Sequence, residues 1–435
     1  MAEVAIAAGE DTAPRIRLPH AFAVFAGNGL EFYNFLSFAL YSVYIAKAFF
    51  PPSSPQLLLT LATFGAGFAT RPIGGIVLGR LGDRIGRKPA MLISFFLMGF
   101  GIAGLALTPT YARIGVAAPI LVLLFRLVQG FALGGEVGPT TAYMIEAAPR
   151  MRRGLFGSMQ YATQDLSQVV ASLVAVALAA ILTDAQLGEW GWRFAFLLGV
   201  SVVPFGLWVR ANLPETLDDA NNSEAVDKAD NGAAGFAGIR PYLKVIVLGF
   251  AILGSGTIGS YVLTYMTTYS LDVLHLSAMI AFGVTTVTSL AQACFEPVSG
   301  WMSDRLGRKP VMMTGAIVTL LSILPSFWLV QHFRTPTALY LAMGWVAIFF
   351  AIMQPPVIVC LTESLPRRVR SGAVGMVYAF AISTFGGTTQ FAVKALIDWT
   401  RNPMVPGFYW AAAATFGVIA MAFLPESAPV KLDKK

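Results

Sequence analysis

Three positively charged side chains stand inside long apolar stretches of this chain: Arg71, Arg126 and Lys394. A charge in such a setting is costly, so by default it marks a binding site or a pathway. A guanidinium in a cavity of low dielectric binds a carboxylate through two parallel hydrogen bonds, and the three cations together favour an anionic ligand. Other interpretations stay open: the arginines form fixed internal ion pairs, and Lys394 pairs with Asp398 one turn away or extends to the polar boundary.

Three carboxylic acids in the same stretches, Glu31, Glu136 and Asp165, are predicted to take up and release protons. On one helix, Glu136 would lie about 15 Å along the axis from Arg126 and roughly 80° around it, so both can face one cavity. The alternative for each acid is a permanent hydrogen bond or ion pair inside the protein.

Uncharged polar side chains accompany these groups at intervals of three and four residues, which places each set on one helical face. Asn34 shares a stripe with Glu31, and Asp165 lies on a broad polar face. Gln292 and Glu296 belong to another such face. From these faces we predict the following ligands: Asn34, Tyr161, Gln164, Tyr265, Gln292 and Gln390.

The elements that carry these residues are predicted to be membrane-spanning helices. The 435 residues are 56% hydrophobic and only 12% charged, whereas soluble proteins carry about 25% charged residues. A spanning helix needs about 20 apolar residues. Twelve such segments can be drawn: 21–46, 57–81, 89–108, 115–147, 154–183, 192–212, 241–269, 277–303, 310–331, 336–362, 371–398 and 405–424.

The distribution of basic residues predicts the orientation of the chain in the membrane. The net charge of +7 is spread over short loops, which is typical of a membrane protein and not of one that binds nucleic acid. Most of the 30 lysines and arginines fall on one side of the predicted bilayer. Since that side faces the cytoplasm, we expect both termini to be cytoplasmic and the protein to lie in the inner membrane.

The chain contains a duplication. Three motifs recur in the same order, which predicts two parallel halves: Gly79-Arg-Leu-Gly-Asp-Arg-Ile-Gly-Arg-Lys-Pro89 with Gly300-Trp-Met-Ser-Asp-Arg-Leu-Gly-Arg-Lys-Pro310, the 146–153 and 363–370 segments, and Leu213-Pro-Glu-Thr216 with Leu424-Pro-Glu-Ser427. The charges inside the apolar stretches do not recur: the second copy has Gln292 where the first has Arg71. A binding function is therefore expected where the copies differ.

The first of these motifs is a loop that combines glycines with one acid and several basic residues. Glycines allow a tight turn and a close approach of helices, and the acid can pair with arginines or cap a neighbouring helix N-terminus. Such contacts can form in one conformation and break in another. We therefore predict a conformational role for these residues: Gly79, Asp83, Arg84, Arg87, Asp304, Arg305 and Arg308. The alternative is that the loops only fix the topology by their charge.

The duplicated loop resembles the signature loop of the major facilitator superfamily, and Arg126-Leu-Val-Gln-Gly130 resembles that superfamily's fourth-helix motif. The segments 28–35, 70–75, 134–138 and 190–193 look like its metabolite:proton symporter branch, although Asn34 stands where that branch commonly has Asp. The resemblance implies an all-α polytopic membrane protein with 12 transmembrane helices in two six-helix halves. The implied segments are 1–20 (N-terminal), 21–212 (first bundle), 213–240 (linker), 241–425 (second bundle) and 426–435 (tail).

The surroundings of Lys394 look most like the citrate-type members of this branch. The resemblance therefore implies proton-coupled uptake of a citrate-like tri- or dicarboxylate by alternating access, in a monomer whose partners are the substrate, protons and lipid. The alternatives are symport of 2-oxoglutarate, a shikimate-like acid, proline or betaine, and export of a drug or metabolite. The sequence has no phosphate-binding loop and no metal-ligand spacing, so we expect no enzyme activity, cofactor or metal.

Overall fold

The computed structural model describes residues 32–33, 35–85, 87–134, 148–200, 242–365 and 375–432, and every regular element in these ranges is a helix. Glu31, Asn34 and Glu136 lie outside the described residues, and so does the predicted linker 213–240. The side chains of Asp83 and Arg87 also lie outside the description.

In the first half of the chain, the described residues form a series of helices. They are α2 (Ser42–Phe49), α3 (Gln56–Ala69), α4 (Arg71–Ile85), α5 (Arg87–Leu107), α6 (Tyr111–Ile114), α7 (Ala117–Gly134), η1 (Arg150–Arg152), α9 (Arg153–Ile181), α10 (Asp184–Gln186) and the π-helical η2 (Leu187–Gly191).

The second half repeats this pattern with longer helices. They are α14 (Leu243–Asp272), α15 (Ala278–Leu306), α16 (Arg308–Phe333), α17 (Pro336–Glu363), the π-helical η4 (Ile382–Gly386), α19 (Gly387–Thr400), α20 (Val405–Phe423) and α21 (Pro429–Leu432).

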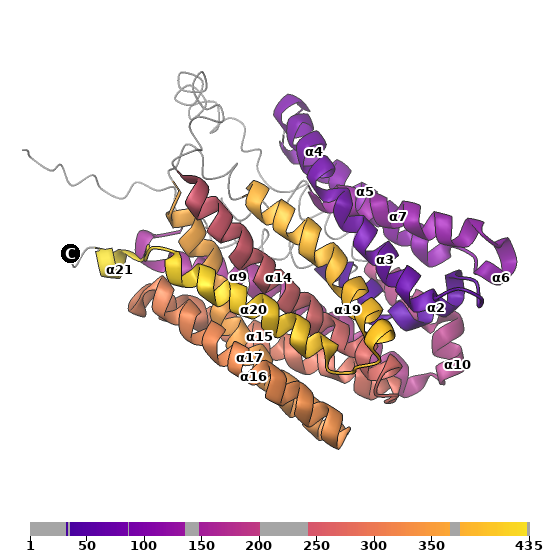
Figure 1. Ribbon diagram of the computed structural model, residues 1–435. Coiled ribbons are helices and arrows are strands. Elements are labelled where there is room, and N and C mark those ends of the chain that lie inside the picture. Colours follow the sequence, from indigo (N-terminus) through magenta and orange to yellow (C-terminus); the bar gives the residue numbers. More distant parts are fainter. Residues whose placement is uncertain are drawn as a thin grey trace, which may run out of the picture.

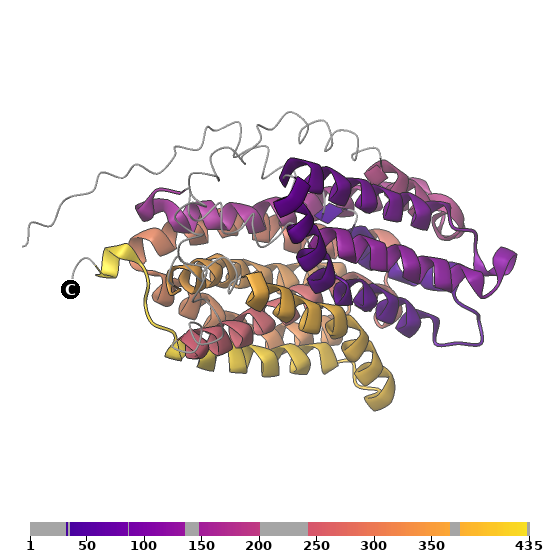
Figure 2. The ribbon, with the colours of Figure 1, turned by 90° about the horizontal axis from the view of Figure 1, so that it is seen from above.

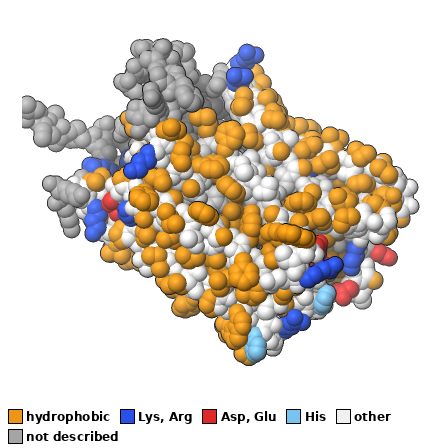
Figure 3. All heavy atoms as spheres, viewed as in Figure 1, with side chains coloured by type: hydrophobic (Ala, Val, Ile, Leu, Met, Phe, Trp, Pro, Cys, Tyr) orange, Lys and Arg blue, Asp and Glu red, His pale blue; other side chains and the backbone are white. Residues whose placement is uncertain are grey.

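Eight helices in the described ranges are long and apolar enough to cross a membrane. Their ends agree with the predicted spans within a few residues where local signals are strong. Thr335 accepts a hydrogen bond from the backbone N–H of Ala338, and Pro336 begins α17, as expected for a capped helix start. Figure 3 shows hydrophobic side chains spread widely over the visible described surface. Leu321 and Phe416, for example, are each 70% exposed. Such a surface suits contact with lipid.

Two hydrophobic cores divide the molecule. One is built mainly from α14, α16, α17, α19 and α20, and the other mainly from the segment 32–41 and from α2, α3, α5 and α7. Figure 1 shows α2 to α7 grouped together, apart from α14 to α20, and Figure 2 shows the same two groups from above. The predicted two-bundle architecture is confirmed by this arrangement and by the fold comparison below.

The two halves meet along α9 and α15, which run antiparallel. The backbones of Gly154 and Gly300 approach each other closely at one end of this seam. Toward the other end, the Thr286 hydroxyl donates to the Ser172 hydroxyl over 2.9 Å. α15 contains Pro297, which has no backbone N–H to bond the carbonyl of Ala293. The seam places the middle of α9 beside the middle of α15.

Candidate functional site

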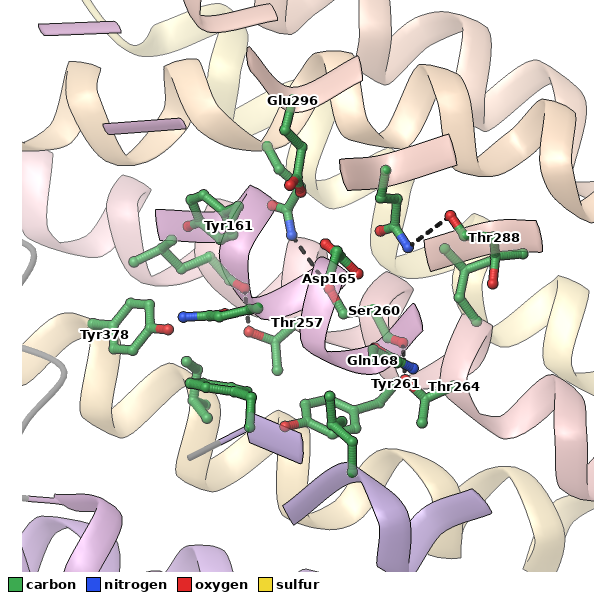
Figure 4. Close-up of a pocket in the computed structure, with 18 of the residues that line it drawn as sticks. Tyr161, Asp165, Gln168, Thr257, Ser260, Tyr261, Thr264, Thr288, Glu296 and Tyr378 are labelled. Carbon is green, nitrogen blue, oxygen red and sulfur yellow. Dashed lines mark hydrogen bonds between the residues drawn. The ribbon is translucent and has the colours of Figure 1, made fainter. Parts of the chain in front are cut away.

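A cavity lies between the two halves, with about 100 Å³ open to the centres of water molecules. About 10–15 Å³ of such space holds one water, so the cavity has room for a small polar ligand or several waters. Helices α4, α9, α14, α15 and α17 contribute its walls, together with the helical segment 375–381 and η4. Figure 4 shows that most labelled side chains around it are polar. Its polar lining consists of Arg71, Tyr161, Gln164, Asp165, Gln168, Thr257, Ser260, Tyr261, Thr264, Thr288, Gln292, Glu296, Gln354 and Tyr378.

Among the described residues that line the cavity, Arg71 is the one with a positively charged side chain. It stands at the break between α3 and α4, where Thr70 is a turn residue and Pro72 follows. The Thr70 hydroxyl donates to the carbonyl of Leu127 over 2.8 Å and so ties this break to α7. The sequence therefore fixes the guanidinium at a helix start, facing the other half.

The Arg71 guanidinium is held by aromatic rings and retains unused donors. Its central carbon lies 4.4 Å from the Phe35 ring centre and 4.1 Å from that of Phe68, and it shares a hydrogen bond with Tyr261. Its Nε and Nη2 atoms are buried and have no hydrogen-bond partner among the described residues. Donors in this condition suit a carboxylate that enters the cavity.

Two carboxyl groups, Asp165 of α9 and Glu296 of α15, lie within hydrogen-bonding reach of each other across the seam between the halves. Figure 4 shows both side chains turned into the cavity near Tyr161. Glu296 is 1% exposed, and its Oε2 atom has no partner among the described residues. A hydrogen bond between two carboxyl groups requires a proton on one of them.

The structure brings together only part of the predicted ligand set. Tyr161, Gln164 and Gln292 line the cavity with Arg71 and Asp165, whereas Tyr265 and Gln390 are not part of its lining. Tyr265 and Gln390 are 0% and 1% exposed.

Arg126 does not line the cavity either, although it was predicted to bind substrate. It is fully buried, with its central carbon 4.5 Å from the ring centres of Phe35 and Phe38 and 5.0 Å from that of Phe64. Its Nη1 donates to the Gln129 side chain over 2.8 Å. Cation–π contacts stabilise a desolvated guanidinium, so Arg126 in this arrangement supports the aromatic wall behind Arg71.

Lys394 is also outside the cavity lining. Its Nζ lies 2.8 Å from Asp272 and 2.7 Å from Asp398. The alternative interpretation of a pairing with Asp398 is therefore the arrangement that the structure contains, and Asp272 of α14 is a second partner that the sequence did not reveal. This cluster joins α14 to α19 within one half.

Several lining residues were not among the predicted ligands, above all Glu296, Tyr261 and Tyr378. Glu296 had been placed on a polar helical face, but that face alone does not identify a partner. Tyr378 follows Glu363 at the same interval at which Tyr161 follows Glu146. The duplication therefore carried a signal for Tyr378, because each half supplies one tyrosine from corresponding positions.

At one end of the seam, Asp304 of the second duplicated loop caps a helix of the other half. Its two carboxylate oxygens accept hydrogen bonds from the backbone N–H groups of Gly154 and Leu155, over 2.8 and 2.9 Å. It also pairs with Arg308 at 2.6 Å, and Arg308 contacts Glu363 at 3.3 Å. The predicted capping of a neighbouring helix is thus found at Asp304. We call Asp304, Arg308 and Glu363 the clasp.

The other loop residues have different surroundings. The Arg305 guanidinium lies 4.2 Å from the Trp301 ring centre. Arg84 is exposed, and a side chain added at Gly79 would meet nothing within 4 Å. In the part of the chain that the structure describes, the second loop therefore joins the halves, whereas Gly79 and Arg84 face outward.

Comparisons with known proteins agree with this architecture. The Major Facilitator Superfamily family matches residues 21–286 and 278–435. The chain is 33% identical over 425 residues to a citrate-proton symporter of Klebsiella pneumoniae, covering 97% of this chain and 95% of the relative. It is 34% identical to an alpha-ketoglutarate permease of Escherichia coli (strain K12), covering 88% of each. An inward-open structure of the xylose transporter XylE from E. coli superimposes with a TM-score of 0.74 at 19% identity, covering 94% of this chain and 96% of that one.

Proposed function

Because this chain belongs to the major facilitator superfamily, we propose that it is a secondary transporter that takes up a small carboxylic acid together with protons. A citrate-like di- or tricarboxylate is the proposed substrate. Relatives named for citrate and for alpha-ketoglutarate support this class. The superfamily fold supports alternating access, in which a site between the halves opens to one side of the membrane at a time.

The observation that carries the proposal is the Arg71 guanidinium in the central cavity. Two of its nitrogen atoms have no hydrogen-bond partner among the described residues, and aromatic rings exclude water from its faces. A carboxylate bound there would receive charge-assisted hydrogen bonds in a setting of low dielectric. Hydroxyl and amide groups from both halves line the same cavity, so one substrate would contact both bundles.

Protons supply the driving force in this proposal. Each positive charge moved inward gains about 2.3 kcal/mol per 100 mV of membrane potential. A citrate trianion therefore needs several accompanying protons, or must enter partly protonated. Glu31, Glu136 and Asp165 are the proposed proton sites, of which Asp165 lies in the described part of the chain.

Uptake into proteoliposomes tests both the substrate and the role of Arg71. With an imposed pH gradient, acidic outside, we expect labelled citrate or 2-oxoglutarate to accumulate in preference to proline. Arg71→Gln should reduce uptake by about 10- to 100-fold, because a hydrogen-bonded charge contributes about 1.5–3 kcal/mol. Arg71→Lys should retain part of the activity, since it keeps the charge but not the fork of donors.

Arg113→Gln is the matched control, because Arg113 is exposed on the short helix α6. It should transport like the unmodified protein. Normal uptake of citrate by Arg71→Gln would contradict the assignment of the anion site. Accumulation of proline alone would contradict the substrate class.

A further inference from the structure

We propose that Asp165 and Glu296 bind one shared proton, and that this proton decides whether the central cavity accepts an anion. The coupling presupposes the proposed proton-driven uptake, whereas the shared proton itself can be tested without any substrate. Asp165 comes from the first half and Glu296 from the second, so the proton would lie at the boundary that alternating access must rearrange.

The geometry of the seam supports a shared site. The pair lies between two fixed contacts of α9 with α15: the clasp, where Asp304 caps Gly154, and the Ser172–Thr286 hydrogen bond. The two carboxyl groups are held within hydrogen-bonding reach, and Glu296 is 1% exposed with an unpartnered Oε2. Two carboxyl groups within hydrogen-bonding reach of each other, one of them buried, cannot both remain ionised without strong repulsion.

The charged and titratable groups around the pair come from several helices. Arg71 of α4 lines the same cavity, and so do three tyrosines: Tyr161 of α9, Tyr261 of α14, and Tyr378. The neighbour from α17 is the neutral Gln354. The titratable residues of α16 lie at its ends, namely Arg308, Lys309 and His332. Among the described lining residues, Arg71 is therefore the cation that balances the pair.

A charge count gives the direction of coupling. With one shared proton the pair carries one negative charge, which Arg71 balances, so the described lining is neutral. When the proton leaves, two carboxylates remain and the lining gains a net negative charge that repels an anion. Proton binding and anion binding therefore favour each other, and linkage makes this effect equal in both directions. We expect loss of the proton to weaken anion binding by about 5- to 150-fold.

Infrared spectroscopy of the purified protein in lipid tests the proton without a substrate. We expect a carboxylic-acid absorption that disappears as the pH is raised, and that is absent from the double variant Asp165→Asn/Glu296→Gln. Glu189→Gln is the matched control, because Glu189 is exposed in η2; it should keep the absorption. Identical spectra for the unmodified protein and the double variant overturn the proposal.

Transport assays test the coupling. With one coupled proton, a gradient of one pH unit concentrates the substrate about tenfold, since each unit is worth about 1.4 kcal/mol. Glu296→Gln keeps a hydrogen-bond donor toward Asp165 but has no proton to release. We expect it to exchange labelled for unlabelled substrate while its pH-driven accumulation falls by about tenfold per pH unit, which is the share of this one proton. Full accumulation by this variant overturns the proposal.

Two further outcomes are informative. If Glu296→Gln does not fold, the exchanged pair Asp165→Glu/Glu296→Asp retains both carboxyl groups and should restore coupling; exchange without coupling in that variant overturns the shared site. If the unmodified protein transports no carboxylic acid, the proposed function fails. The infrared result then still decides whether the pair holds a proton.

Discussion

Phe35 is the residue whose ring contacts both buried arginines, Arg71 and Arg126. The guanidinium carbons of Arg71 and Arg126 lie 4.4 and 4.5 Å from its ring centre. Arg71 faces the cavity and Arg126 does not, so one aromatic ring separates a ligand-facing charge from a fully buried one. The ring therefore sets the position of Arg71 as well as its environment.

Phe35→Leu should lower the free energy of unfolding by about 2–4 kcal/mol, because two desolvated cation–π contacts are lost at about 1–2 kcal/mol each. Phe38→Leu should cost about half as much, since Phe38 contacts Arg126 alone of the two arginines. Thermal unfolding in detergent measures both. Phe96→Leu is the control, because Phe96 is 65% exposed. Equal effects of all three substitutions would contradict the cation–π account.

The structure places Arg71 and Asp165 in the lining of the cavity and Arg126 outside that lining, while the ligand and proton roles assigned to the three residues stay predictions. The apolar stretch gives the depth of a charge in the membrane, and helical periodicity gives its face. The direction in which that face points depends on how helices pack against one another, which is a long-range property. Glu296 shows the same limit, because its polar face was visible whereas its partner Asp165 stands on a helix of the other half.

At the scale of elements, glycines set the distance between α7 and the α3–α4 pair. A side-chain carbon at Gly130 would collide with the backbone carbonyl of Gly67, one at Gly134 with that of Arg71, and one at Gly74 with that of Phe131. The four-residue spacing of Gly130 and Gly134 places both glycines on the face of α7 that makes these contacts. Arg71 keeps its place because the backbones lie this close together.

Gly130→Ala should destabilise the protein by about 1–3 kcal/mol, because neither backbone can move without disturbing the packing around it. The substitution should also reduce uptake, since displacement of the α3–α4 pair would move Arg71. Gly79→Ala is the matched control, with open space at that position, and should be neutral or slightly stabilising. Thermal stability of the two purified variants decides the matter. A Gly130→Ala protein as stable as Gly79→Ala would refute the close approach.

Helix boundaries were predicted well where local chemistry defines them, as at Thr335 and Pro336. The π-helical segments η2 and η4 were not predicted. A π-turn adds a residue to a helix without changing its apolar character, so the pattern of hydrophobic residues carries almost no record of it. η4 precedes α19 directly and contributes Ile382 to the cavity lining, so this omission concerns the site itself.

At the scale of the whole molecule, the clasp joins the two halves at one end of the seam. Its carboxylate, Asp304, belongs to the second half, and the helix N-terminus that it caps belongs to the first. A negative charge at a helix N-terminus is favourable. Opening this end of the molecule must break that contact, whereas the Lys394 cluster lies within one half and is not broken by motion between the halves.

Asp304→Asn should therefore shift the population toward molecules open at the clasp end. A loss of about 1–2 kcal/mol corresponds to a change of about 5- to 30-fold in that equilibrium. Spin labels at positions 152 and 305, both exposed, would report longer distances in a background without the two native cysteines. Asp272→Asn removes an acid from a pair inside one half and should leave the distances unchanged. Equal distances in all variants would rule out a latch.

Pro297 gives the seam helix α15 an uneven stiffness. A helix bends most easily where a backbone hydrogen bond is missing, and α15 lacks the hydrogen bond to the carbonyl of Ala293. Glu296 adjoins this weak point, while Asp304 stands about 10 Å further along the axis, at the tip of the short arm. A force of electrostatic origin on Glu296 thus acts near a pivot, and the arm beyond it carries the displacement to the clasp. In α15 the residue on which the force acts and the point of bending are therefore neighbours, and the end that moves lies at the clasp.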